Sequence, residues 1–320
     1  MRRSMVAARL AAALVCLSAT AYAADAAQPA SPGPAAPKAA IKTGPVAADV
    51  LAASSPADWR SPDPENLLYM DLAQGRVIIE LAPAFAPAHV DNIRKLVREG
   101  WFDGLAVDRV QDNYVTQWGD ADNTRTPKTA QTKLAPEFVV RGAAVAKLPF
   151  TPLPDRDTYA PEAGYSDSFP AARDAKGQQA WLIHCYGMVG VGRDMALDSG
   201  SGAELYAVIG QAPRHLDRNI TVVGRVLRGM DILSSLPRGT AALGFYDKPE
   251  QRIPIAKVRL AADLPADQRE KLMVLRTDTP TWAAYVEARR NRREDFFPAP
   301  AGHVDVCNIP LPIRMADASK

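Results

Sequence analysis

The most informative stretch of this 320-residue chain is residues 100–120, which read GWFDGLAVDRVQDNYVTQWGD. An Asp-Gly pair near its start predicts a turn, and the residues that follow alternate between two faces as in a β-strand. Strict alternation places Arg109 on one face with Val107 and Gln111. Asp108 and Val110 then lie on the opposite face. An arginine within a mostly apolar strand is unusual, so Arg109 is the first candidate for a functional residue.

Three pieces of this stretch resemble the signature of the cyclophilin family of peptidyl-prolyl isomerases. The family pattern, FYDG, FHRV and FMIQGGD, corresponds here to WFDG at 101–104, VDRV at 107–110 and YVTQWGD at 114–120. Later segments are also similar to the family: LAPEF at 134–138, GMVGVGR at 187–193, AELYAVI at 203–209, HLD at 215–217, and the run from 220 to 233. The resemblance implies a mainly β fold, a closed eight-stranded antiparallel barrel with capping helices. It stops at about residue 264, and the residues beyond predict a partly helical C-terminal extension.

Local patterns agree with this order of elements. Residues 67–72 and 75–81 predict the two strands of a hairpin, and residues 253–260 predict the last strand. Between them, apolar residues at 90, 93, 96 and 97 mark one face of a helix. Pro87 suits the first turn of that helix, and Gly100 suits its end.

The chain divides by composition into four parts. Residues 1–23 combine a basic start, an apolar run and a small-x-small end, as in a secretory signal peptide. Residues 24–65 are rich in Ala, Pro and Ser and predict a disordered linker, whose Val50, Leu51 and Trp59 are candidates to dock on the folded domain. The barrel spans residues 66–262 with an insertion or elongated loop at about 139–179, and residues 263–320 form a C-terminal extension.

Two features mark the C-terminal extension. Thr279 followed by Pro280 predicts the start of a helix. Arginines at 289, 290, 292 and 293 suit either docking of an anionic partner or a solvated helix end whose cations favour the helix dipole. Residues 296–312 are rich in proline, and we expect them to lie on the surface of the barrel.

Composition narrows the partners. The chain has 38 basic and 36 acidic residues, and removal of residues 1–23 with their three arginines leaves 35 against 36. Bulk charge therefore gives no reason to expect a nucleic-acid partner. The four histidines lack ligand spacing, so we expect no metal and no cofactor. No second apolar segment of spanning length follows the signal, so we expect a periplasmic protein that is not inserted in the membrane.

The family resemblance also assigns candidate site residues. It implies that Arg109 is the catalytic arginine and that Gln117 orients it. Rotation about an X–Pro bond needs no nucleophile or metal, only a group that stabilises the twisted amide. The resemblance implies an apolar pocket for the proline ring formed by Tyr114, Val115, Tyr206 and Leu216. The complete set of implied substrate-binding positions is Tyr114, Val115, Gly192, Arg193, Glu204, Tyr206, His215 and Leu216.

Four positions depart from the family pattern. Asp108, Glu204, His215 and Ile220 stand where the family has His, Gln, Trp and His. We expect an altered peptide preference from these changes. The two carboxylates lie near Arg109, where a salt bridge could either hold the guanidinium in place or pull it away from substrate.

Two cysteines, Cys185 and Cys307, remain after the predicted signal. An oxidising compartment permits a disulfide between them. The alternative is two separately buried thiols.

The most favoured function is peptidyl-prolyl cis–trans isomerisation during the folding of exported proteins, acting on proline-containing unfolded or extended polypeptides. A competing hypothesis is a catalytically weak or inactive peptide-binding module that acts as a chaperone. A third is a cell-envelope interaction protein that acts through its C-terminal tail.

Overall fold

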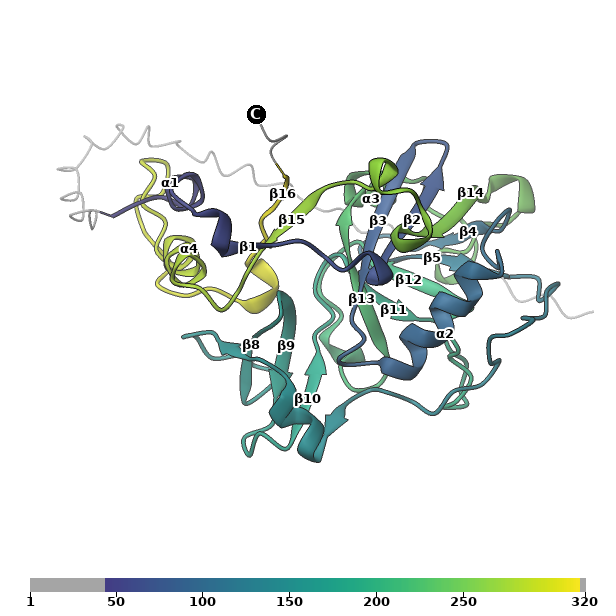
Figure 1. Ribbon diagram of the computed structural model, residues 1–320, viewed down its shortest axis with the longest axis horizontal. Coiled ribbons are helices and arrows are strands. Elements are labelled where there is room, and N and C mark those ends of the chain that lie inside the picture. Colours follow the sequence, from purple (N-terminus) through teal and green to yellow (C-terminus); the bar gives the residue numbers. More distant parts are fainter. Residues whose placement is uncertain (1–43, 317–320) are drawn as a thin grey trace, which may run out of the picture. The chain divides into compact units, whose positions relative to one another are not determined.

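The computed structural model describes residues 44–316 (Figure 1), so the predicted signal peptide and the first part of the predicted linker lie outside the described residues. Eight antiparallel strands close into a barrel in the order β11-β12-β5-β4-β14-β2-β3-β13. The mainly β barrel expected from the sequence is therefore confirmed. In chain order its strands are β2 (Leu67–Leu72), β3 (Gly75–Leu81), β4 (Ala106–Val110), β5 (Val115–Gly119), β11 (Met188–Val191), β12 (Leu205–Val208), β13 (Val222–Arg228) and β14 (Ile253–Leu260).

The barrel is filled by alternate side chains of its strands. In β12, Leu205 and Ala207 belong to the core inside the barrel, whereas Tyr206 and Val208 belong to a small cluster outside it. Two helices complete this inner core. Helix α2 (Pro87–Arg98) buries the apolar face predicted from the sequence and starts with Pro87, and α3 (Met230–Ser235) contributes Leu233. The filled interior leaves the outer wall as the place for a binding site.

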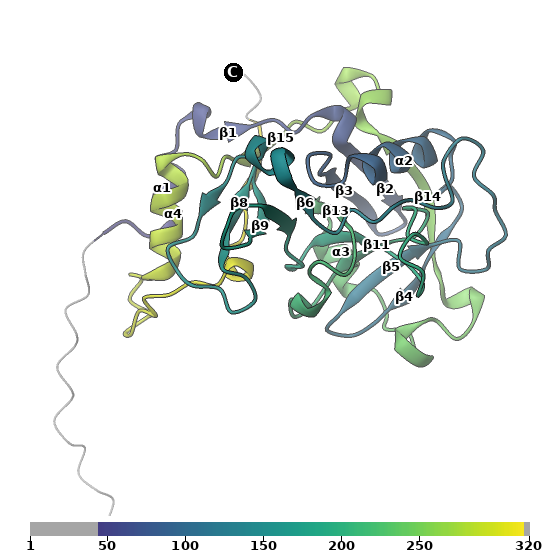
Figure 2. The same cartoon turned by 90° about the horizontal axis from the view of Figure 1, so that it is seen from below.

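The insertion at 139–179 is a second sheet rather than a long loop. Its strands pair in the order β6-β10-β9-β8-β7. A tight turn with positive φ at Asp167 and Ser168 joins β8 to β9, as in a two-residue hairpin. Figure 2 shows β8 and β9 in teal beside α4, and the ring of Tyr165 in β8 meets Trp282 of α4 edge to face. The strands are β6 (Val140–Arg141), β7 (Thr151–Pro152), β8 (Glu162–Ser166), β9 (Phe169–Arg173) and β10 (Gln179–Leu182).

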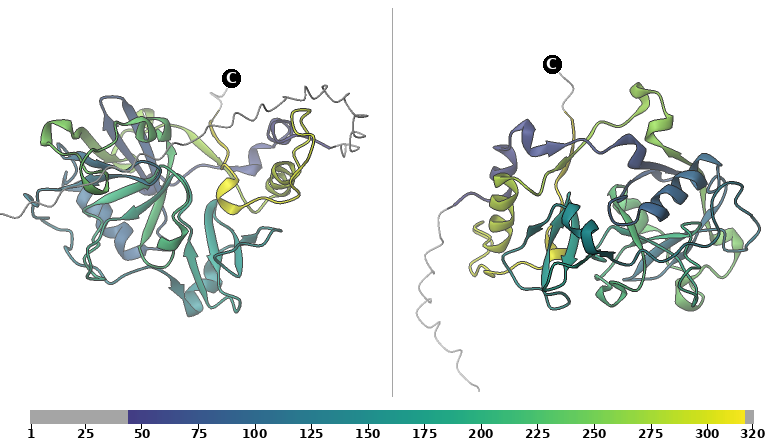
Figure 3. Two further views of the ribbon diagram at one scale, coloured as in Figure 1. Left: turned by 180° about the vertical axis from the view of Figure 1, so that it is seen from behind. Right: turned by 60° about the horizontal axis from the view of Figure 1, so that its bottom comes forward.

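The described part of the predicted linker is folded, which corrects the expectation of disorder for residues 44–65. It forms α1 (Ala47–Ala52) and β1 (Trp59–Arg60). Strand β1 pairs with β15 (Leu272–Leu275), which pairs in turn with β16 (Ile313–Met315). Figure 3 shows the purple α1 beside the yellow α4 from two directions, in agreement with their contacts. Val50 and Trp59 of this segment are buried and Leu51 packs beside them, which is why the segment folds back.

The C-terminal extension begins its helix where the sequence predicted. Helix α4 (Pro280–Arg290) has Thr279 as its cap, whose hydroxyl accepts a hydrogen bond from the Trp282 amide. Residues 296–312 were expected on the barrel, but their second half lies against the insertion sheet. The hydroxyl of Tyr165 donates to the carbonyl oxygens of Val306 at 2.9 Å and Ile309 at 3.2 Å. The arginines that end α4 are largely paired with acids of the extension and of the insertion.

These additions share one hydrophobic cluster, which we call the outer core. It joins the N-terminal segment, the insertion, the C-terminal extension and the outward side chains of β2 and β3. A disulfide between Cys185 and Cys307 ties the chain just after β10 to the extension, and it is one of the two alternatives that the sequence left open. The largest side chains of the outer core are Trp59, Tyr69, Phe85, Tyr165, Phe169, Trp181, Trp282 and Tyr285.

Candidate active site

A cleft of about 820 Å³ opens on the outer wall of the barrel, over β4, β5, β11 and β12. Neighbouring strands place their outward residues side by side, and Gln117 of β5 lies directly opposite Tyr206 of β12. Of the ten residues proposed from the sequence, His215 alone does not line the cleft, and it stacks behind Tyr114 instead. The nine that line it are Arg109, Tyr114, Val115, Gln117, Gly192, Arg193, Glu204, Tyr206 and Leu216.

The strand that carries Arg109 does not alternate as predicted. Its pairing with β5 shifts register between Val107 and Arg109, so Asp108 is an extra residue, a β-bulge. As a result Val107 and Val110 both point into the inner core, while Asp108 and Arg109 both line the cleft. The prediction that Asp108 shares a face with Val110 was therefore wrong, because alternation along one strand cannot reveal a bulge.

Arg109 is fixed by hydrogen bonds and by two rings. Its Nε donates to the Leu243 carbonyl at 2.8 Å, one terminal nitrogen donates to Gln117 Oε1 at 3.0 Å, and the other donates to Gln111 Oε1. The guanidinium carbon also lies 5.6 Å from the ring centre of Tyr114 and 5.3 Å from that of Phe245. No carboxylate in the described part of the chain takes a hydrogen bond from it. Neither of the two salt bridges considered from the sequence is formed.

Glu204 is linked to Arg109 indirectly, through Gln117. Its carboxylate accepts a hydrogen bond from Gln117 Nε2 at 2.9 Å, and this contact fixes the amide so that Oε1 faces Arg109. Gly119 on the next strand leaves space for Glu204, because an added Cβ there would lie 2.6 Å from Glu204 Cγ. Glu204, one of the departures from the family pattern, is thus linked through Gln117 to Arg109 by a chain of hydrogen bonds.

An apolar pocket lies beside the guanidinium. Val115 and Tyr206 form its floor with Val208 packed beneath them, and Tyr114 and Ile220 pack against this cluster at the side. Leu216 also lines the cleft. The Tyr206 ring reaches across Gly190, where an added Cβ would lie 2.2 Å from the hydroxyl oxygen. Glycine is therefore required at 190 for Tyr206 to occupy this position.

At the rim of the cleft near Gly192, the side chain of Arg193 makes contacts with neighbouring residues. The Arg193 side chain donates to the carbonyl oxygens of Asn219 and Asp194 and lies over the ring of Phe138. The amide of Gly192 donates to the Glu204 carbonyl at 3.0 Å.

Two carboxyl groups of the cleft are held away from their ordinary ionisation. Burial raises the pKa of Asp108 to about 7, and the nearby negative charge of Glu204 adds to this effect. Burial also raises the pKa of Glu204, against the hydrogen bond from Gln117. Burial lowers the pKa of Arg109, but a guanidinium stays charged at any pH of interest. The cleft therefore holds a permanent cation beside an acid that titrates near neutrality.

Sequence reasoning missed three members of the site. Leu243 and Phe245 come from a loop between β13 and β14, outside the segments that resemble the family. Leu243 adopts a left-handed backbone conformation, with φ 59°, and its carbonyl accepts from Arg109. His184 was set aside as an isolated histidine, yet it lies 2.9 Å from the Tyr206 hydroxyl. The adjacent Phe245-Tyr246 pair in a polar loop was the one available signal for the first two. Within residues 44–316, no three His, Cys, Asp or Glu side chains converge as metal ligands would, and no helix there is long and apolar enough to cross a membrane.

A closed β-barrel with an arginine and an apolar pocket side by side on its outer wall is the arrangement that the resemblance implies for the class of barrel-shaped prolyl isomerases. Residues 67–260 match the family described as cyclophilin type peptidyl-prolyl cis-trans isomerase/CLD. The chain therefore belongs to the cyclophilin family of peptidyl-prolyl cis-trans isomerases.

Individual relatives agree with this assignment. A probable peptidyl-prolyl cis-trans isomerase of Brucella suis is 30% identical over 202 residues, which are 63% of this chain and 85% of the relative. Peptidyl-prolyl cis-trans isomerase B of Bacillus subtilis is 24% identical over 172 residues, 53% of this chain and 90% of the relative. The crystal structure of cyclophilin AquaCyp293 from Hirschia baltica is similar with a TM-score of 0.65 at 26% identity, covering 86% of this chain and 100% of that one. The structural likeness thus extends beyond residues 67–260.

Proposed function

We propose that Arg109 catalyses prolyl isomerisation by stabilising the twisted form of the X–Pro amide. The planar amide resists rotation by roughly 18–20 kcal/mol because twisting it removes its resonance. The twisted form has a prolyl nitrogen with a usable lone pair, to which a fixed N–H group can donate. The observation that carries this proposal is the position of the Arg109 guanidinium, fixed at the edge of an apolar pocket.

The hydrogen-bond count of Arg109 supports this role. A guanidinium has five N–H donors. Within residues 44–316 three of them are used, toward Leu243, Gln117 and Gln111. Two donors therefore remain for a substrate amide, and the group that carries them is already oriented. A donor that is already oriented loses little conformational entropy when substrate binds, so its hydrogen bond can stabilise the transition state in full.

The apolar floor of Val115 and Tyr206 would take the proline ring, with Tyr114 and Ile220 at its side. Gln117 and Glu204 would keep the guanidinium in register, and Gly192 and Arg193 would border the peptide backbone. The cleft is open along the outer wall, so it would admit an extended chain. We therefore propose proline-containing unfolded or extended polypeptides as substrates.

Two features favour exported proteins as the clients. The first 23 residues have the pattern of a secretory signal. The disulfide between Cys185 and Cys307 is typical of proteins that leave the reducing cytoplasm. We propose the periplasm as the place of action, which expression with a carboxy-terminal reporter and cell fractionation would test.

Exchange NMR on an Ala-Pro peptide, with Arg109→Ala beside the wild type, tests the catalytic proposal. Loss of one positioned donor to a transition state costs about 100-fold or more in rate, so we expect kcat/KM to fall by at least that factor. Arg76→Ala is the matched control, because Arg76 on β3 also lies over a tyrosine ring and is held by side-chain oxygens, here those of Asp71, but stands outside the cleft.

Equal rates for wild type and Arg109→Ala would contradict catalysis by Arg109. They would favour the second candidate, a non-catalytic peptide-binding module. Two observations give that candidate its weight, namely the carboxylates Asp108 and Glu204 where the family has His and Gln. Aggregation assays on a proline-free unfolded client would then measure the chaperone function directly.

A further inference from the structure

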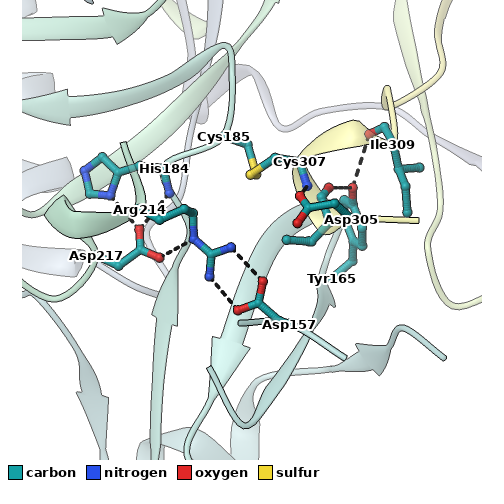
Figure 4. The surroundings of a disulfide bond; sticks show 10 residues. Asp157, Tyr165, His184, Cys185, Arg214, Asp217, Asp305, Cys307 and Ile309 are labelled. Atoms are coloured by element: carbon teal, nitrogen blue, oxygen red, sulfur yellow. Dashed lines mark hydrogen bonds and ion pairs between the residues drawn. A yellow bond between two sulfur atoms is a disulfide. The ribbon is translucent and has the colours of Figure 1, made fainter. Parts of the chain in front are cut away.

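A buried chain of polar side chains leads from the floor of the proline pocket to the insertion sheet. It starts at Tyr206, whose hydroxyl lies 2.9 Å from His184 Nε2. His184 Nδ1 lies 2.9 Å from Asp217 Oδ1, and the His184 backbone amide donates to the same oxygen at 3.0 Å. Asp217 accepts a further hydrogen bond from Arg214 Nε at 2.7 Å. Arg214 then donates both terminal nitrogens to the two carboxylate oxygens of Asp157, each at 2.8 Å (Figure 4).

All five side chains are out of water. Tyr206, His184, Arg214 and Asp217 are each less than 10% exposed, and the Asp157 side chain is 3% exposed. The direction of the hydrogen bonds around His184 follows from its two partners, the Asp217 carboxylate and the Tyr206 hydroxyl. Because a carboxylate can only accept, a neutral His184 carries its hydrogen on Nδ1, and Nε2 then accepts from Tyr206. Burial raises the pKa of Tyr206, so its hydroxyl keeps the proton that it donates.

Arg214 is the junction of this chain. Burial alone would lower the pKa of Arg214, but its hydrogen bonds to Asp157 and Asp217 outweigh burial and raise it. The pKa of Asp157 is lowered, since the hydrogen bonds and charge of Arg214 outweigh burial there too. A buried cation that lost one of two carboxylate partners would be left with unpaired N–H groups, which is strongly unfavourable. Removal of Asp157 would therefore favour displacement of the Arg214 side chain from its present position.

The position of Arg214 matters because it lies in the turn that contributes Leu216 to the pocket. Arg214 and Asp217 flank Leu216, which lines the cleft, and His215, which stacks on Tyr114. The same Asp217 orients His184, which fixes the Tyr206 hydroxyl. The floor of the pocket at Tyr206 and its wall at Leu216 thus both depend on the turn at 214–217. The positive charge of that turn, on Arg214, is paired with Asp157 of the insertion.

We propose that Asp157 is a positioning residue for the isomerisation, acting through Arg214, Asp217 and His184 to fix Tyr206 and Leu216 around the proline ring. The insertion is then part of the enzyme's working site rather than an appendage. This inference rests on the proposed function, since it assumes that the proline ring sits on Tyr206.

A double-mutant cycle on the full mature chain tests the coupling. Asp157→Asn removes the charge at one end, and Tyr206→Phe removes the hydroxyl at the other end while keeping the ring. We expect each single variant to lower kcat/KM by about 10-fold, with kcat affected as well as KM, and the double variant to lose little more than either alone. Interacting positions show such non-additivity, whereas independent ones add.

Asp155→Asn is the matched control. Asp155 lies on the same loop and makes the same two-pronged ion pair, with Arg290 at 2.7 and 2.9 Å, but its partner belongs to α4 and not to the pocket. We expect it to lower stability without changing kcat/KM. A loss for Asp155→Asn equal to that for Asp157→Asn would overturn the inference, and so would simple additivity of Asp157→Asn with Tyr206→Phe.

A second measurement keeps the test independent of turnover and of the folding of Asp157→Asn. Nitrogen-15 NMR of the His184 ring in the wild type and in Tyr206→Phe reports the Nε2 hydrogen bond, and the Kd of an Ala-Pro peptide reports the pocket. We expect the Nε2 signal to move and the peptide to bind about 10-fold more weakly in Tyr206→Phe. If the wild type proved inactive but these two changes appeared, the catalytic proposal would fail while the positioning chain stood. An unchanged Nε2 signal and Kd would overturn the chain itself.

Discussion

The inner core of the barrel and the outer core beside it are built in opposite ways. The inner core takes alternate residues from regular strands, some of them consecutive in the chain, such as β2 and β3, and others distant in it, such as β3 and β13. The outer core collects side chains from residues near 50, from the insertion and from residues 272–311, segments that are far apart in the chain. Local pattern therefore predicts the strands that build the first core, while the second core is not visible in local pattern and forms only once the chain has folded back on itself.

The largest expected effect comes from removing one tryptophan of each core. Trp118 and Trp282 are both 1% exposed, and Trp→Ala in a core costs about 3–5 kcal/mol. The described residues fall within one compact unit, so we expect a single unfolding transition for both variants in urea. Trp118→Ala should also lower kcat/KM, because Trp118 follows Gln117 in β5, whereas Trp282→Ala should leave it near wild type. Two separate transitions in Trp282→Ala would show instead that the outer core is an independent unit.

The disulfide tests how strongly the outer core is tied to the barrel. The bond closes a loop with a sequence separation of 122 residues. Replacing both Cys185 and Cys307 by serine should lower the free energy of unfolding by about 2–4 kcal/mol. Reductant should destabilise the wild type by a similar amount and leave the double variant unchanged. If reductant affected both proteins equally, the loss would have another origin.

Asp108 gives an effect of opposite sign within the barrel site. Its pKa is raised in the fold from 3.8 to about 7, so the folded state holds a proton that the unfolded state releases between these values. Stability from this group is present below about pH 4 and is lost as pH rises through about 7. Asp108→Asn should therefore stabilise the protein by about 2 kcal/mol at pH 8, within the limit of roughly 4 kcal/mol that the two pKa values allow, and by nearly nothing at pH 4.

Activity should follow the same titration. Deprotonation of Asp108 adds a negative charge beside Arg109, so kcat/KM of the wild type should decline as pH rises through about 7, and that of Asp108→Asn should not.

Asp122→Asn is the contrasting control for stability. The hydrogen bond from Arg252 lowers the pKa of Asp122, so this variant should lose rather than gain stability at pH 8. Equal behaviour of the two variants would contradict the burial of charge at 108.

The smallest effect belongs to the cap of α4. Thr279 accepts from the Trp282 amide, and loss of such a cap costs about 1 kcal/mol. Thr279→Ala should lower stability by that amount, Thr279→Ser should restore it, and neither should change kcat/KM. A change in activity would mean that the outer core reaches the catalytic cleft through α4 as well as through Asp157.

The sequence predicted the elements that have a local period. The strands at 67–72, 75–81 and 253–260, helix α2 and the start of α4 are where their patterns place them. The family motifs also brought nine site residues to one cleft, although their roles stay predictions. The features that were missed depend on partners elsewhere in the chain. The bulge at Asp108 is set by pairing with β5, and His184 looked isolated because its partners come from positions 206 and 217.

The Cys185–Cys307 bond has one more consequence, for a chain that is cut. The bond encloses four of the eight barrel strands, β11 to β14, and the loop that carries the exposed Leu243. A protease nick in that loop would leave the two fragments joined as one species on a non-reducing gel. They would separate only after reduction, so a nicked molecule would keep both halves of its barrel together.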